Sequence, residues 1–126
     1  MTADFSAETA FDVLAPAQQR VPFVFNSPHS GRVYPQRFLD LAQLDGWQIR
    51  RSEDCFVDEL FMGAVALGAP LLRAHFPRAY LDANREPLEL DPAMFTHAFP
   101  MPINAASPRV AAGLGTVPKL DRKSVV

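Results

Sequence analysis

The chain has 126 residues, of which 48% are hydrophobic, and its 12 Lys and Arg against 14 Asp and Glu give a formal net charge of −2. This length fits one ordinary domain, and the apolar content can supply a core. Because the charges nearly balance and no basic run occurs, nucleic acid is not expected as a partner. No apolar stretch approaches the roughly 20 residues that span a bilayer, so we expect no membrane segment.

The first residues lack a basic segment followed by an apolar one, so we predict no secretory signal peptide. The single cysteine, Cys55, excludes an intramolecular disulfide and fits a reducing compartment. We therefore expect a cytoplasmic location. An acidic pair precedes Cys55, which argues against a nucleophilic thiolate at this position.

The pattern along the chain alternates strands with helices. Residues 1–20 are predicted to form an N-terminal arm with one short turn or strand. The β-branched and aromatic run 21–25 predicts a buried strand that ends in a loop. Apolar spacing over 35–44, with Pro35 at a tolerated first-turn position, predicts a short helix. Trp47 follows that helix, and we expect it to pack rather than to bind a ligand.

The clearest helix is predicted over 53–67, where apolar residues recur at helical spacing. Ser52 is its expected N-cap, and Gly68 lies where a C-cap belongs. A second strand is predicted over 70–76. The order of strand, helices and strand favours a βαβ-like unit with parallel pairing.

The second half of the chain is less regular. A short strand is predicted over 78–82. From position 87 onward, six prolines prevent any long helix in 83–118, where only 110–117 suggests a brief strand with a glycine turn. A loop this long without structure in a compact domain is usually functional, or else its elements are wrongly placed. The predicted fold class is α/β, a partial mixed or parallel sheet with flanking helices, in a single domain over 21–119 with a tail at 120–126.

The loop Asn26-Ser-Pro-His-Ser-Gly-Arg32 follows the first predicted strand directly. In open α/β sheets, ligands bind outside the carboxyl ends of the strands. Ser27, His29 and Arg32 would therefore stand where a site forms, and Gly31 would allow a tight turn. The alternative is a polar turn with a solvent-facing histidine.

His29 and the Glu53-Asp54 pair are candidate metal ligands. Imidazole and carboxylate are a common ligand mix for zinc, and a strand end and a helix start can face the same rim. The alternative is that acids in a first helical turn need no metal, because the helix dipole favours them there.

Arg78, Asp82, Asn84 and Arg85 form a second candidate group. Guanidinium groups bind carboxylates with two parallel hydrogen bonds, so this turn could clamp an acidic ligand. The alternative is a solvated turn with Arg–Asp pairing.

Three further acids and two histidines carry weaker predictions. The acids could orient the arginines or form a plain polar loop; they are Glu86, Glu89 and Asp91. His75 lies in a predicted strand and is expected to be structural, and His97 has no partner that spacing reveals.

Three motifs resemble those of N-formylglutamate amidohydrolases, and they occur in the family's order over about residues 20–119: Ser27-Pro-His-Ser-Gly-Arg32, Arg51-Ser-Glu-Asp-Cys-Phe-Val-Asp-Glu-Leu60 and Phe76-Pro-Arg-Ala-Tyr-Leu-Asp-Ala-Asn-Arg85. Leu88–Phe95 and Gly113–Pro118 also look like that family. The resemblance implies a fold similar to zinc carboxypeptidases and aspartoacylases. It also implies zinc as cofactor and hydrolysis of N-formyl-L-glutamate to formate and glutamate, late in histidine degradation.

The resemblance assigns roles residue by residue. His29 would be a zinc ligand, and Glu53 or Asp54 the second, with Glu53 slightly favoured. Asn84 and Arg85 would hold the substrate carboxylate, and Arg78 would bind another carboxylate or polarise the scissile carbonyl. The remaining candidates for substrate contact are Ser27 and Arg32.

Members of the family are substantially longer than 126 residues. We therefore expect an N-terminal portion, with a further zinc ligand and the general base supplied by a missing C-terminal half. The alternatives are a noncatalytic remnant that binds a small dicarboxylate, a fragment that folds only against a partner chain, and a hydrolase of another N-acyl amino acid.

Overall fold

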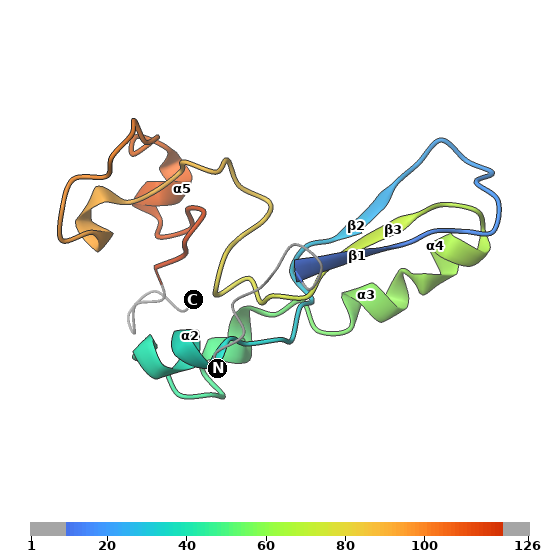
Figure 1. Cartoon of the computed structure of the whole chain (residues 1–126), viewed down its shortest axis with the longest axis horizontal. Coiled ribbons are helices and arrows are strands. Elements are labelled where there is room, and N and C mark those ends of the chain that lie inside the picture. The colour runs from blue at the N-terminus through green and yellow to red at the C-terminus, as the bar shows by residue number, and fades with distance from the viewer. Residues whose placement is uncertain (1–9, 120–126) are drawn as a thin grey trace.

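A computed structural model describes residues 10–119 and shows a small mixed sheet in the order β1-β3-β2 (Figure 1). Its strands are β1 (Phe11–Leu14), β2 (Phe25–Ser27) and β3 (Leu71–Ala74). β2 runs parallel to β3, with Phe25 opposite Leu71, whereas β1 runs antiparallel to β3. The predicted α/β class and the parallel pairing are thus confirmed.

Short helices accompany this sheet. They are α2 (Gln36–Leu41), α3 (Val57–Leu60), α4 (Met62–Ala66) and α5 (Pro108–Ala111), with 3-10 turns η1 (Ile49–Ser52) and η2 (Pro92–Met94). α3 and α4 run alongside the strands, and the segment around α5 forms a separate lobe (Figure 1). None of the helices in the described part of the chain is long and apolar enough to cross a membrane.

The predicted helix over 53–67 is wrong at its start. Glu53 is extended, and Phe56 adopts a left-handed conformation with φ of 63°, so helical structure begins only at Val57. The amide of Asp54 donates to the carbonyl of His29 (3.0 Å), a tertiary bond that takes this segment out of a helix. Ser52 therefore caps nothing. Gly68 does end the helical segment with φ of 93°, as expected.

The first strand starts later than predicted. The carbonyl of Pro70 accepts the amide of Phe25 and the carbonyl of Gly68 accepts the amide of Arg20, but residues 21–24 between them form no strand. Pro22 has no amide hydrogen to donate to a neighbouring strand, which is consistent with the absence of a strand over 21–24. Phe23 and Val24 are accordingly exposed.

Two other predicted strands are wrong. Residues 78–82 form a turn, in which the amides of Tyr80 and Leu81 donate to the carbonyl of Pro77. The segment 110–117 instead starts within α5 and continues through a turn at Gly113, whose φ is 75°. The two segments bond to each other rather than to the sheet, because the amide of Asp82 donates to the carbonyl of Thr116 (2.8 Å).

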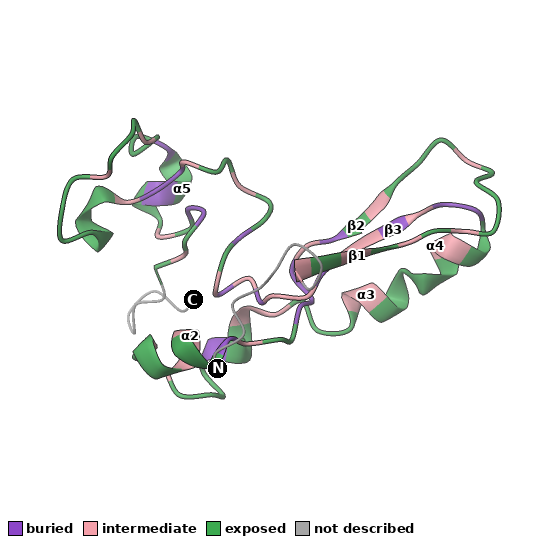
Figure 2. Cartoon of the chain, viewed as in Figure 1, coloured by how far each residue is buried: buried purple, intermediate pink, exposed green. Residues whose placement is uncertain are grey.

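The buried core is small and centred on β3 and the loops beyond it (Figure 2). Leu71 is fully buried, and the other buried apolar residues are Ile49, Ala69, Ala74, Ala79, Leu90 and Val110. Trp47 is 82% exposed, so the expectation that it packs is wrong. β1 provides the strand expected within 1–20; residues 1–9 of that arm and the predicted tail at 120–126 lie outside the described residues.

Candidate active site

The loop after β2 is pressed against the end of β3. A Cβ atom on Gly31 would lie 2.1 Å from the carbonyl oxygen of Phe76, so only glycine fits there. Val33 donates to the carbonyl of His75 (2.9 Å), which fixes the same approach. The loop therefore delivers its side chains at the carboxyl ends of two parallel strands, as the sequence predicts.

His29 lies at the centre of the site and is 6% exposed. Its Nε2 hydrogen-bonds Oδ1 of Asp82 (2.7 Å), and its Nδ1 lies 3.3 Å from Oδ2 of Asp54. The imidazole is thus held between two carboxylates that come from different segments. The solvent-facing alternative for His29 does not describe this arrangement.

Asp82 joins the site's residues through one buried carboxylate. Besides His29, it accepts the amide of Asn84 (2.9 Å) and Nε of Arg78 (3.1 Å), and it pairs with the guanidinium of Arg85 (3.5 Å). Burial alone would raise the pKa of Asp82, but the hydrogen bonds from His29 and Asn84 and the nearby Arg78 together lower it. The carboxylate therefore stays charged at neutral pH.

Asp54 and Glu53 point to different neighbours. The Asp54 side chain is half-exposed and faces His29. The Glu53 carboxylate is buried, accepts the hydroxyl of Tyr34 (2.5 Å) and pairs with Arg50 (3.2 Å). Burial, and then the bond to Glu53, raise the pKa of the Tyr34 hydroxyl. Glu53 thus belongs to a separate cluster.

The arginines of the predicted clamp differ in their engagement. Arg85 donates to the carbonyls of Leu114 and Asn84, each at 2.8 Å, so three of its nitrogens are in use. Its guanidinium still has further N–H donors. Arg78 meets Asp82 through Nε only among the described residues, and its side chain is 28% exposed.

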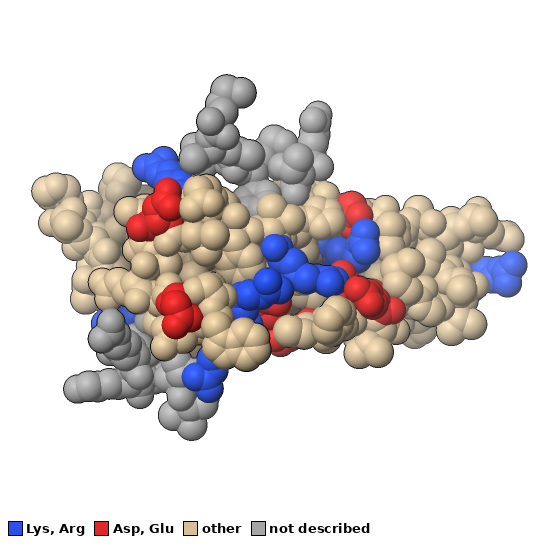
Figure 3. Space-filling view, turned by 90° about the horizontal axis from the view of Figure 1, so that it is seen from below, with Lys and Arg blue, Asp and Glu red and all other residues tan. Residues whose placement is uncertain are grey.

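Two other candidates lie apart from this network. Ser27 is 1% exposed, with its hydroxyl 2.5 Å from that of Ser30. Arg32 pairs with Asp58 and Glu59 on α3 and lies over the ring of Phe56. Its hydrogen bond to Glu59 and the two negative charges raise its pKa. On the face seen in Figure 3, basic side chains gather in a run over the middle of the molecule, with acidic side chains beside them.

The weaker sequence candidates also have partners. Glu89 is buried and bonds to Ser107 and Arg109, so it does not contact Arg78 or Arg85. Nε2 of His75 lies 3.6 Å from Asp12, which suits a structural role. His97 is exposed.

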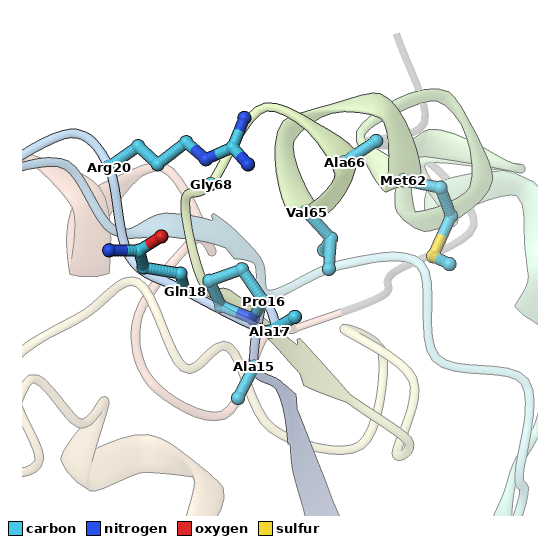
Figure 4. A pocket seen from close by; sticks show the side chains of 9 residues that line it. All are labelled: Ala15, Pro16, Ala17, Gln18, Arg20, Met62, Val65, Ala66 and Gly68. Carbon is cyan, nitrogen blue, oxygen red and sulfur yellow. The ribbon is translucent and has the colours of Figure 1, made fainter.

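A hollow lies at the opposite end of the sheet. It measures about 410 Å³ and is lined by the loop 15–20 and by Met62, Val65, Ala66 and Gly68 (Figure 4). Its wall is mostly small and apolar, with Arg20 at the rim. Arg20 is the only charged residue of this lining, so the candidate site remains the polar network around His29.

The mixed sheet places the chain in the α/β class, with the network around His29 at the carboxyl ends of the parallel strands β2 and β3. The family model for N-formylglutamate amidohydrolase matches residues 21–125, so the chain belongs to the N-formylglutamate amidohydrolase family. It is similar to the crystal structure of N-formylglutamate amidohydrolase from Ralstonia eutropha JMP134, at 34% identity and a TM-score of 0.79. The match covers 87% of this chain and 38% of that one. No curated protein matches the chain.

Sequence reasoning grouped Asp82 with the arginines and missed its bond to His29. The sequence separation of 53 residues hides that contact. It also missed Tyr34, the partner of Glu53. The available signal is the position of Asp82 between Arg78 and Arg85 in the sequence, because one carboxylate there can pair with both guanidinium groups.

Proposed function

We propose that this chain contributes two zinc ligands, His29 and Asp54, to an enzyme that hydrolyses N-formyl-L-glutamate to formate and L-glutamate. The observation that carries the proposal is the orientation of the His29 ring, in which Nδ1 faces Asp54 and Nε2 is hydrogen-bonded to buried Asp82. A carboxylate on the far nitrogen of a ligating histidine fixes its tautomer and ring orientation. Family membership supports the substrate.

The spacing of the two donor atoms fits zinc. Ligands about 2.0–2.2 Å from a tetrahedral ion lie about 3.3–3.5 Å from each other. Nδ1 of His29 and Oδ2 of Asp54 are 3.3 Å apart, which favours Asp54 over Glu53 as the second ligand. A bound zinc ion would supply Lewis acidity at the scissile formyl group.

The ligand set in the described chain is incomplete. Within residues 10–119, no group of three or more His, Cys, Asp or Glu side chains gathers as a metal site. A catalytic zinc keeps three protein ligands. We propose that a C-terminal half, in a fold like that of zinc carboxypeptidases, supplies the third ligand and the general base.

The remaining polar residues would bind the substrate. Asp82 orients His29 and holds Arg78 beside it, so the terminal amino groups of Arg78 could reach the formyl oxygen or a carboxylate. Asn84 is exposed next to them, and Arg85 keeps donors for a carboxylate. The proposed setting is cytoplasmic histidine degradation, for which the single cysteine suits a reducing compartment.

The test compares D54N with E53Q, using zinc binding measured by chelator competition. We expect D54N to weaken zinc binding at least about tenfold, because it removes a charged ligand, and E53Q to leave it within about twofold. Formate release from N-formyl-L-glutamate would be measured with and without an added C-terminal half from a relative. Equal zinc binding by wild type and D54N would overturn the ligand assignment.

A second candidate function is binding of a small dicarboxylate without catalysis. It is favoured by the pairing of Arg78 and Arg85 on one carboxylate at a turn that exposes Asn84. Glutarate binding that is unchanged by chelator, with no turnover in either arrangement above, would support it. Turnover of another N-acyl amino acid in preference to N-formyl-L-glutamate would instead change the substrate.

A further inference from the structure

Glu89 is a buried carboxylate outside the site, and it accepts hydrogen bonds from three other residues. It accepts the hydroxyl of Ser107 (2.6 Å), a guanidinium nitrogen of Arg109 (3.3 Å) and the amide of Glu86 (3.2 Å), and it is 2% exposed. Ser107 is also the N-cap of α5. We call Glu89, Ser107 and Arg109 the Glu89 clasp.

The backbone around the clasp leads directly to the site. The carbonyl of Glu89 accepts the amide of Thr116 (2.8 Å), and the carbonyl of Thr116 accepts the amide of Asp82 (2.8 Å). The intervening Gly115 passes so close that an added Cβ would lie 2.4 Å from the Glu89 carbonyl oxygen. The clasp therefore fixes the strip 114–116.

The same strip holds Arg85. The carbonyl of Leu114 accepts Nε of Arg85 (2.8 Å), and the amide of Leu114 donates to the carbonyl of Arg109 (2.7 Å). Arg109 is itself a member of the clasp. The Glu89 carboxylate and the start of α5 are thus linked through residues 114–116 to Asp82 and Arg85 of the site.

We propose that the Glu89 clasp positions Arg85 and Asp82 for a substrate carboxylate, acting through residues 114–116. The substrate part of this inference rests on the proposed function. Glu89 touches neither substrate nor metal here and is a positioning residue. Since no strand or long helix holds residues 83–119 in the described chain, these polar contacts supply the order that the turn needs.

The experiment measures hydrogen exchange at the Arg85 Nε–H and the Asp82 amide by NMR, in the 126-residue chain. The variants are E89Q, which keeps the shape and removes the charge, and S107A, which removes one donor. The matched control is E86Q, because the exposed Glu86 carboxylate bonds to Asn104 and not to the clasp. The backbone of Glu86 does bond to Glu89 and Thr116, and this substitution leaves that backbone unchanged. We expect exchange at both sites to rise about tenfold in E89Q and S107A and to stay unchanged in E86Q.

Two readouts separate this role from general weakening and from failure of the proposed function. Exchange at the Arg73 amide of β3 should stay unchanged, whereas an equal rise there would overturn the inference in favour of global destabilisation. Unchanged exchange at Arg85 and Asp82 would also overturn it. N-formyl-L-glutamate binding should weaken at least about threefold in E89Q. If the local exchange rises but wild type binds no N-formyl-L-glutamate or glutarate, the substrate role of Arg85 is refuted.

Discussion

Replacing Asp82 by asparagine tests the centre of the site. D82N keeps the size of the side chain. If the amide oxygen keeps the hydrogen bond to His29, the amide nitrogen, which is a donor, faces the guanidinium groups of Arg78 and Arg85. A hydrogen bond to a charged group contributes about 1.5–3 kcal/mol, and breaking a fully buried pair costs about 3–5 kcal/mol. Because Arg78 is 28% exposed, we expect the lower range, a loss of about 2–3 kcal/mol.

Urea unfolding of the 126-residue chain measures this loss. With a slope of about 1.5–2 kcal/mol/M, the urea midpoint should fall by roughly 1–2 M. D40N is the matched control, since Asp40 is exposed and bonds only to Gln36 on its own helix among the described residues; it should stay within about 0.5 kcal/mol of wild type. D82N should also weaken zinc binding about 10–100-fold. A D82N midpoint equal to that of D40N would refute the role of Asp82 as the junction of the network.

Two predictions concern the loop and the acids. G31A should destabilise the chain by about 3 kcal/mol or more in urea unfolding, because backbone atoms at Phe76 would have to move. The control G46A should change the stability by less than about 1 kcal/mol, because its added Cβ meets nothing within 4 Å. Similar values for the two variants would refute the close approach of Gly31 to Phe76. The pKa values of Asp12, Asp82 and Glu89 are lowered on folding, so their stabilisation is present above the ordinary values of 3.8 and 4.5 and is lost as pH falls through the folded values. The urea midpoint should therefore hold down to about pH 5 and drop below it; a midpoint that rises on acidification would contradict this sign.

The sequence predicted which segments meet at the site but not how they meet. A strand end and the following acids do share one rim, as the position of His29 before a helical pattern suggests. Asp54 reaches it from an extended segment, however, because the helix starts only after the left-handed turn at Phe56. Apolar periodicity over 53–67 cannot reveal that turn, since the residues on either side still follow helical spacing. The choice between Glu53 and Asp54 depends on it entirely.

The irregular second half was harder to predict for a different reason. Between residues 83 and 119 the described chain takes its order from polar contacts such as the Glu89 clasp, and these leave no periodic pattern in the sequence. Propensity alone suggested a strand at 110–117, yet Ser107 caps a helix there and Pro108 occupies its first turn. The acids at 86, 89 and 91 were read as one group, but only Glu89 is buried.

The contacts that build the site are largely those that hold the loops on the sheet. His29 offers its carbonyl to the amide of Asp54 and its imidazole to Asp82, so one residue joins β2 to two distant segments. Gly31 sets the depth of that loop against Phe76. Because few apolar residues are buried, these polar bonds cannot loosen without moving the donor atoms of the proposed metal site. A substitution that weakens the loop–sheet contact should therefore reduce stability and zinc affinity together, whereas one on the exposed face of α2 should change neither.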